Sequence, residues 1–178
     1  KMGGTLGRYY RATRKGRGFL GCMLRRVQKC ADIRQGHENA GTHIPPFLIA
    51  SIASQCNLHC AGCYARAGGA CGESRSAADL STEKWESLFE EAAGLGIPFI
   101  LLAGGEPFLR RDVIRAAARN RDIVFPGFTN GTMLEEEYLN LLDESRNIIP
   151  VFSIEGAAGQ TDRPRGEGVS AVLSGAMD

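Results

Sequence analysis

Three cysteines fall within the short segment CNLHCAGCYA at positions 56–65. Cys56, Cys60 and Cys63 have the spacing C-x3-C-x2-C, and Gly62 beside the third allows the backbone to approach a bound group closely. A disulfide needs two cysteines and a closed zinc site needs four ligands, whereas three thiolates suit a metal centre with one open position. A [4Fe–4S] cluster held by three thiolates leaves one iron free for an outside ligand. The spacing therefore favours an iron–sulfur cluster in this loop.

Zinc binding and simple packing stay open as alternative roles for these cysteines. A zinc site could combine them with His43, His59 or Cys71, although zinc sites more often pair one C-x2-C unit with a second, and the sequence has no second unit. The thiols could also be buried packing groups, but the loop is polar and rich in glycine. Cys71 lies close enough to the loop to be an additional ligand or a reactive thiol, and Cys30 receives no role.

The composition is that of a globular protein with a core. Of 178 residues, 43% are hydrophobic and 23% are charged. No stretch approaches the roughly 20 apolar residues of a membrane span, and the basic start lacks the apolar core and cleavage site of a signal peptide. Because the cysteines are clustered as for a metal rather than spread as in a disulfide scaffold, a reducing cytoplasm is the expected compartment.

A basic arm precedes the rest of the chain. Residues 1–36 hold ten Lys and Arg against one acid, whereas the remainder holds 11 against 19. We expect the arm, residues 1–45, to form an amphipathic helix that packs on a core domain at 46–178. An acidic partner, nucleic acid or a membrane surface is the alternative, but no basic motif interleaved with aromatic residues supports nucleic-acid binding. The residues expected on the apolar face are Phe19, Leu20, Cys22, Met23, Leu24 and Val27.

Strand and helix patterns alternate from residue 46 onward, which predicts βα units and a parallel sheet. Ser81 is the expected N-cap of one helix, and Thr132 with Glu135 forms an expected capping box for another. Pro126 in the third strand predicts a bulge or bend there, and a proline also interrupts the fourth strand. Strands are expected at 46–54, 97–103, 122–130 and 148–154, with helices at 81–94, 112–120, from 132 and near the C-terminus.

The unusual polar segments all follow predicted strands. The cysteines follow the first strand, AGGEP (103–107) the second, TNGT (129–132) the third and SIEG (153–156) the fourth. In parallel α/β sheets, ligands bind at the carboxyl ends of the strands. The sequence therefore predicts one site that these four segments share.

These segments resemble those of a known family. CNLHCAGCYA resembles the cysteine signature of the radical S-adenosylmethionine enzymes, and GGEP resembles that superfamily's second hallmark. TNGT, SIEG and TDRPRGEG come in the order expected of its branch of peptide-modifying maturases and molybdenum-cofactor and haem-biosynthesis enzymes. The resemblance runs from about residue 46 to the C-terminus. It implies a partial (βα) barrel with about four of six βα units present, in the N-terminal fragment of a longer protein.

The resemblance also implies roles for individual residues. Cys56, Cys60 and Cys63 would bind three irons of a [4Fe–4S] cluster, and the amino and carboxylate groups of S-adenosylmethionine would chelate the fourth. Residues 104–106 would receive the methionine ammonium, and Arg165 would meet the carboxylate or ribose. The residues assigned to cofactor binding are Gly104, Gly105, Glu106, Asn130, Ser153 and Arg165.

The implied activity is reductive cleavage of S-adenosylmethionine to a 5′-deoxyadenosyl radical, which takes hydrogen from a peptide, tetrapyrrole or small molecule. An electron donor such as flavodoxin or ferredoxin is the implied partner. A non-catalytic iron–sulfur electron-transfer module and a zinc-stabilised interaction domain are the alternatives. GGEP, Ser153 and Arg165 favour the enzyme, because an electron carrier has no use for a cofactor site.

Overall fold

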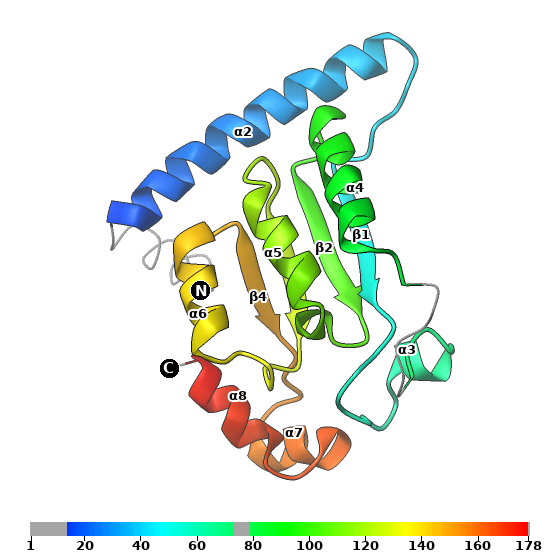
Figure 1. The fold of residues 1–178 in the computed structure, drawn as a ribbon, viewed down its shortest axis with the longest axis vertical. Helices are drawn as coiled ribbons and strands as arrows, with labels where there is room; N and C mark the ends of the chain where they lie inside the picture. The colour runs from blue at the N-terminus through cyan, green and yellow to red at the C-terminus, as the bar shows by residue number, and fades with distance from the viewer. Residues whose placement is uncertain (1–13, 73–78, 178) are drawn as a thin grey trace.

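A computed structural model describes residues 14–72 and 79–177, so part of the predicted basic arm, residues 1–13, lies outside the described residues. Figure 1 shows a sheet with helices on one face and one long helix across its end. The elements in chain order are α2 (Arg14–Asn39), β1 (Phe47–Ala53), α3 (Tyr64–Ala67), α4 (Thr82–Gly94), β2 (Phe99–Gly104), the 3-10 helix η1 (Pro107–Leu109), α5 (Arg111–Arg119), β3 (Phe125–Thr129), α6 (Glu136–Ser145), β4 (Ile148–Phe152), α7 (Ala158–Arg165) and α8 (Val169–Met177).

The sheet has the order β1-β2-β3-β4, and each neighbouring pair is parallel. Successive strands are therefore adjacent, with α4, α5 and α6 returning the chain across the same face (Figure 1). This is the arrangement of consecutive βα units in a barrel, so the predicted α/β class and partial (βα) barrel are confirmed. The carboxyl ends of all four strands meet at one edge.

The core lies between the sheet and these helices. Along β1, Ala50 and Ile52 are buried, whereas Phe47 and Ile49 on the other face are exposed. This alternation is expected where one face of a sheet is covered and the other is open. The ring of Phe89 on α4 meets that of Phe125 on β3 edge to face, with centroids 4.9 Å apart. Full burial of each such side chain contributes about 1.5–3 kcal/mol to stability.

The predicted helix starts are partly confirmed. Ser81 is the N-cap of α4, and its hydroxyl accepts a hydrogen bond from Lys84 N–H. The predicted capping box at Thr132 and Glu135 is wrong, because α6 begins later, with Glu135 as an N-cap that makes no side-chain cap bond. The Thr132 hydroxyl instead donates to the side-chain oxygen of Asn130. The hydroxyl of Thr132 therefore bonds within the loop after β3 and does not cap α6.

The predicted bulge at Pro126 is also wrong in detail. Pro126 lies within β3, which keeps an unbroken five-residue register with β4. The neighbouring Phe125 N–H donates to Asn147 O on the β4 side, so the next N–H would point toward β2, and proline has none. Within these strands β3 pairs with β2 only at Leu102 and Gly127. The proline therefore weakens the β2–β3 ladder without bending the strand out of the sheet.

Helix α2 crosses the amino ends of the strands (Figure 1). Cys30 is buried, the Arg34 guanidinium donates to the carbonyl of Gly96, and Arg26 lies 3.3 Å from Asp122. The helix therefore packs against the residues at the amino ends of the strands. The prediction that Leu24 lies on the packed face is wrong. Leu24 is 66% exposed, because it is not on the helix face that contains the buried Cys30.

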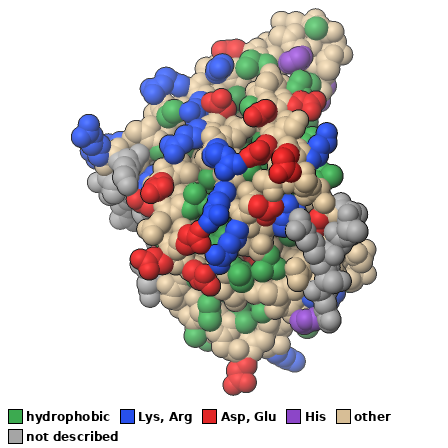
Figure 2. All heavy atoms as spheres, viewed as in Figure 1, with side chains coloured by type: hydrophobic (Ala, Val, Ile, Leu, Met, Phe, Trp, Pro, Cys, Tyr) green, Lys and Arg blue, Asp and Glu red, His purple; other side chains and the backbone are tan. Residues whose placement is uncertain are grey.

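Charged side chains of both signs cover the outer face of α4, α5 and α6 (Figure 2). Arg119 on α5 pairs with Glu86 on α4, and Arg111 on α5 pairs with Glu135 and Glu137 at 2.9 and 3.0 Å. Exposed ion pairs contribute about 0–1 kcal/mol each, so this is a solvated face. None of the described helices combines the length and the apolarity needed to cross a membrane.

Candidate active site

A cavity of about 370 Å³ opens at the carboxyl ends of the four strands. The segments that line it are the cysteine loop after β1, the GGEP turn after β2, the end of β3, the end of β4 and the last turn of α7. The cavity brings together every residue that the sequence assigned to the site: Cys56, Cys60, Cys63, Gly104, Gly105, Glu106, Asn130, Ser153 and Arg165.

Backbone hydrogen bonds hold the cysteine loop. Cys63 is the N-cap of α3, and its carbonyl accepts from Ala67 N–H at 2.9 Å. Ala61 N–H donates to the carbonyl of Pro164 at 2.7 Å, which joins the loop to α7. The Cys56, Cys60 and Cys63 side chains are half-buried free thiols. The loop therefore presents three sulfur atoms from a fixed backbone.

The two glycines of GGEP let β2 approach the start of the cysteine loop. A Cβ atom on Gly104 would lie 2.3 Å from Ala53 O, and one on Gly105 would lie 2.3 Å from Gln55 O and 3.1 Å from Cys56 Cβ. Gly105 N–H donates to Ala53 O at 2.7 Å. Any side chain here would push the first cysteine away, so glycine is required for the close contact.

The carboxylate of Glu106 points into the protein. Glu106 is 1% exposed and accepts hydrogen bonds from Phe108 N–H at 3.0 Å, the Thr129 hydroxyl at 2.9 Å and Asn130 N–H at 2.8 Å. Burial raises the pKa of the carboxyl, and the three donors oppose that rise. Glu106 thus ties the end of β2 to the end of β3, and its predicted contact with the methionine ammonium stays a prediction.

A second set of bonds links β3 to the cysteine loop. The Asn130 amide donates to the side-chain oxygen of Asn57 at 2.9 Å, and the Asn57 amide donates to the Thr132 hydroxyl at 2.7 Å. Asn130 also accepts from Thr132 N–H at 3.0 Å. Asn57 follows Cys56 directly, so the network fixes the residue beside the first thiol.

Arg165 reaches the cavity from the end of α7. Its Nη2 lies 2.6 Å from the Oε1 oxygen of Glu155, and its side chain is 15% exposed. Its Nε atom is buried and has no hydrogen-bond partner within residues 14–72 and 79–177. An unsatisfied buried donor of a guanidinium is costly unless an acceptor arrives. The cavity therefore offers a donor to an anionic or polar ligand.

Three features fit the donor set to a [4Fe–4S] cluster with a small organic ligand: the three thiols at one cavity wall, the glycine contact that fixes the first of them, and the unsatisfied Arg165 donor. A single metal ion fits less well. Within the described residues, no three His, Cys, Asp or Glu side chains converge closely enough to hold one ion, whereas the cysteines of a cube bind different irons. His43 lies beside Glu38 at 2.9 Å, and His59 is exposed.

Several residues of the site are absent from the set that the sequence predicts. Asn57 and Thr129 connect the lining segments, and their positions beside Cys56 and Asn130 were the available signals. Tyr64 and Phe128 also line the cavity and are 79% and 45% exposed. Phe128 could have been found from the alternation in β3, because it points away from the buried Phe125 and Gly127.

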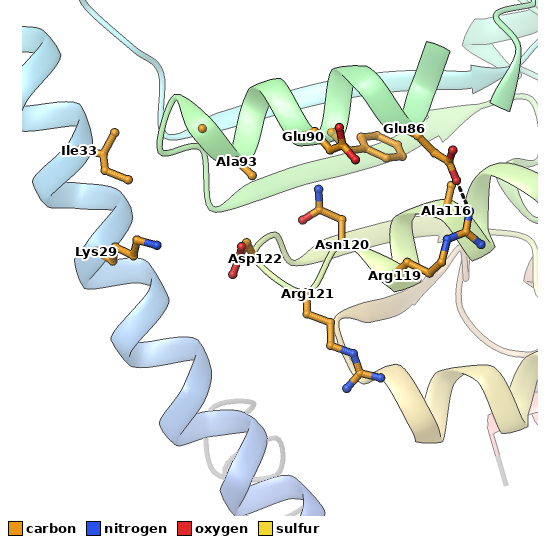
Figure 3. Close-up of a pocket in the computed structure, with 12 residues that line it drawn as sticks. Lys29, Ile33, Glu86, Glu90, Ala93, Ala116, Arg119, Asn120, Arg121 and Asp122 are labelled. Atoms are coloured by element: carbon orange, nitrogen blue, oxygen red, sulfur yellow. Dashed lines mark hydrogen bonds and ion pairs between the residues drawn. The ribbon is translucent and has the colours of Figure 1, made fainter. Parts of the chain in front are cut away.

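A larger hollow of about 590 Å³ lies at the other end of the sheet, between α2 and the ends of α4 and α5 (Figure 3). Lys29 and Ile33 of α2 face it from one side, and Glu86 and Arg119 form an ion pair on the other (Figure 3). No cysteine lines it, and charges of opposite sign share its walls. The cavity at the carboxyl ends is therefore the candidate active site.

Comparison with known proteins gives a family match. Residues 51–172 match the family model described as the Radical SAM superfamily, whose members are enzymes that use a [4Fe–4S] cluster and S-adenosylmethionine. The chain is 33% identical over 135 residues to the Fe-coproporphyrin III synthase of Methanosarcina barkeri, which covers 75% of this chain and 31% of that protein. It is 32% identical over 103 residues to the PqqA peptide cyclase of Gluconobacter oxydans, and this match covers 57% of this chain and 28% of that protein.

Solved structures share the fold. SuiB of Streptococcus suis bound to the precursor peptide SuiA gives a TM-score of 0.61 at 20% identity, covering 78% of this chain and 31% of that one. The structure of native anSMEcpe with bound AdoMet gives a TM-score of 0.53 at 19% identity, and the match covers 74% of this chain and 41% of that chain. The chain thus spans about a third of the length of the curated relatives named above.

Proposed function

This chain belongs to the Radical SAM superfamily, and from that premise we propose that it binds the [4Fe–4S] cluster and S-adenosylmethionine of a hydrogen-abstracting enzyme. The observation that supports this most is the cavity that these segments share at the carboxyl ends of the strands. It combines Cys56, Cys60 and Cys63 with the GGEP turn and Arg165. An electron-transfer module needs the thiols but not a cavity beside them.

Each cysteine would hold one iron, which would leave the fourth iron for an outside ligand. When bound, the two cofactors supply one electron and a sulfonium bond that this electron cleaves, which is the source of hydrogen abstraction. The protein's part is to hold the thiols at fixed positions and to limit water. The bond from Ala61 to Pro164 and the glycine contact at Cys56 support that part.

The remaining lining residues are assigned to S-adenosylmethionine. The buried donor of Arg165 suits a carboxylate or a ribose oxygen, and Ser153 and Asn130 line the same cavity. The backbone of residues 104–106 borders the position assigned to the methionine ammonium. Tyr64 and Phe128 present exposed rings to the cavity, and such rings stack on nucleobases. The two rings are therefore our candidates for contact with adenine.

A peptide, a tetrapyrrole or another small molecule is the proposed substrate, and a flavodoxin or ferredoxin is the proposed electron donor. The relatives named as a coproporphyrin synthase and a peptide cyclase support the first two classes. The open face of the sheet carries the exposed apolar residues Ile49 and Phe128, and Phe128 also lines the cavity. Free thiolates need a reducing compartment, and the cytoplasm is the proposed one.

The test is the formation of 5′-deoxyadenosine. The protein is reconstituted with iron and sulfide without oxygen, then reduced in the presence of S-adenosylmethionine. We expect 5′-deoxyadenosine from the wild type and from Cys30→Ala, whose thiol is buried on α2 at the opposite end of the sheet. We expect none from Cys60→Ala. Product that persists in Cys60→Ala, or stoichiometric zinc in place of iron, would contradict the proposal.

A further inference from the structure

One further cysteine, Cys71, lies near the cysteine loop. Cys71 is 7% exposed and follows Cys63 by one short helix and a glycine-rich turn. It is not among the residues that line the cavity. Cys71 is therefore a buried residue near the cysteine loop that lies outside the lining of the cavity. Neither the proposed cluster ligation nor the proposed cofactor contacts use it.

The backbone fixes Cys71 between the two ends of the cysteine loop. Cys71 N–H and Ala70 N–H both donate to Ala65 O, at 3.1 and 2.7 Å, just after Cys63. The next residue, Gly72, donates to Ser54 O at 2.9 Å, just before Cys56. The chain turns back through Gly69, whose φ of 71° suits glycine. Cys71 is thus pinned from both sides.

The thiol of Cys71 makes a side-chain hydrogen bond with that of Cys63, and the thiol of Cys60 is also near. A Cys63 sulfur bound to iron is a thiolate without a proton, so it can only accept a hydrogen bond. The Cys71 S–H must then be the donor. The direction of the bond therefore follows from the proposed ligation of Cys63.

We propose that Cys71 is a positioning residue whose S–H donates to the Cys63 sulfur, orients that ligand and raises the reduction potential of the cluster. The proposal rests on the proposed function. Hydrogen bonds to ligand sulfurs are among the factors that set the potentials of iron–sulfur clusters. Such a bond favours the reduced cluster, because reduction adds negative charge that the donor stabilises.

The midpoint potential of the cluster, without S-adenosylmethionine, is the measurement. It is obtained by redox titration followed by electron paramagnetic resonance on the reconstituted protein. We expect Cys71→Ala to bind the same iron and sulfide as the wild type and to have a more negative potential. Cys71→Ser keeps a donor of similar size, so its potential should stay near that of the wild type. Cys30→Ala loses an equally buried thiol far from the cluster and should match the wild type.

The outcomes separate this proposal from the function on which it rests. A wild type without a [4Fe–4S] cluster would overturn both. Equal potentials in the wild type and Cys71→Ala would overturn only the role of Cys71. If Cys71→Ala fails to hold a cluster, Cys71→Ser decides: a cluster with a potential near the wild type supports the donor, whereas loss of the cluster from a folded Cys71→Ser means an iron ligand instead.

Discussion

The side-chain amide of Asn130 donates a 2.9 Å hydrogen bond to the side-chain oxygen of Asn57. The two residues are 73 positions apart in sequence. Asn57 follows Cys56, and Asn130 directly follows β3, so the bond ties the residue beside the first cysteine to the loop at the carboxyl end of β3. Asn57 in turn donates to Thr132 at 2.7 Å. The position of Cys56 therefore depends on a loop that contributes no sulfur.

Replacement of Asn57 tests this dependence. Asn57→Ala removes one donor and one acceptor and leaves the amide of the buried Asn130 without this partner. The expected loss in the free energy of unfolding is about 1–3 kcal/mol, with faster loss of iron to a chelator. Asn140→Ala is the matched control, because Asn140 is exposed on α6. Equal rates of iron loss in the two variants would contradict the bracing role.

The contact at Gly105 gives a second prediction. In Gly105→Ala, the added Cβ would lie 2.3 Å from Gln55 O and 3.1 Å from Cys56 Cβ, so the cysteine loop must move. Overpacking of this kind costs about 1–3 kcal/mol, and we expect lower iron content after reconstitution. Gly36→Ala on α2 is the control, because nothing lies within 4 Å of its Cβ. Normal iron content in Gly105→Ala would show that the close contact is dispensable.

The buried Glu106 predicts a pH dependence of stability. Burial raises its pKa in the folded chain above the ordinary value of about 4.3. At a pH between the ordinary pKa and the raised pKa, the folded chain therefore binds more protons than the unfolded chain. Its contribution to stability is therefore complete below the ordinary pKa and is lost as the pH rises through the folded value. Relative to Glu106→Gln, the wild type without iron should become less stable as the pH is raised above about 4.3.

Urea unfolding at a series of pH values measures this difference. Glu106→Gln keeps the acceptor for Phe108 and Thr129 but places an amide opposite Asn130 N–H, so it starts with one lost bond. The test is therefore how the difference in the free energy of unfolding between the wild type and Glu106→Gln changes with pH, and not the size of that difference at one pH. Glu90→Gln, which removes an exposed carboxylate on α4, gives the background. A difference that grows in favour of the wild type with rising pH would refute the inward, desolvated carboxylate.

Local patterns were sufficient to predict the strands and the common site. The four apolar runs form the strands in sequence order, and the carboxyl-end rule places the cysteines, GGEP, TNGT and SIEG around one cavity. These features depend on burial and on the handed βα connection, which act over short stretches. For the same reason Ser81, whose partner is three residues away, was assigned correctly.

Long-range contacts explain the rest. Glu106 beside two glycines gives no sign that its carboxylate turns inward, since its donors Thr129 and Asn130 lie 23 and 24 positions later. Thr132 fits a capping box locally, but its hydroxyl accepts a hydrogen bond from Asn57 and donates one to Asn130 instead. Leu24 fits an apolar helix face, but only the position of α2 across the sheet decides which turns are covered. Tertiary partners override local preference in each case.

Arg165 gives the last prediction, which concerns cofactor affinity. Its guanidinium already holds Glu155 through Nη2 and keeps a buried Nε without a partner in the described part of the chain. A carboxylate of S-adenosylmethionine would satisfy that donor, and hydrogen bonds to charged groups contribute about 1.5–3 kcal/mol. Arg165→Lys retains the charge but loses the planar fork. We expect its dissociation constant for S-adenosylmethionine to rise about tenfold to a hundredfold.

Equilibrium dialysis on the cluster-loaded protein measures this affinity. Arg163→Lys is the matched control, because Arg163 lies on the same helix and is exposed. Iron content must be equal in the two variants, since α7 also contacts the cluster loop through Pro164 and Ala61. A weaker affinity in Arg165→Lys alone supports a direct contact with the cofactor. Unchanged affinity would mean that Arg165 serves only to hold Glu155 and the end of α7, because a bound carboxylate that lost the Nε donor would bind more weakly.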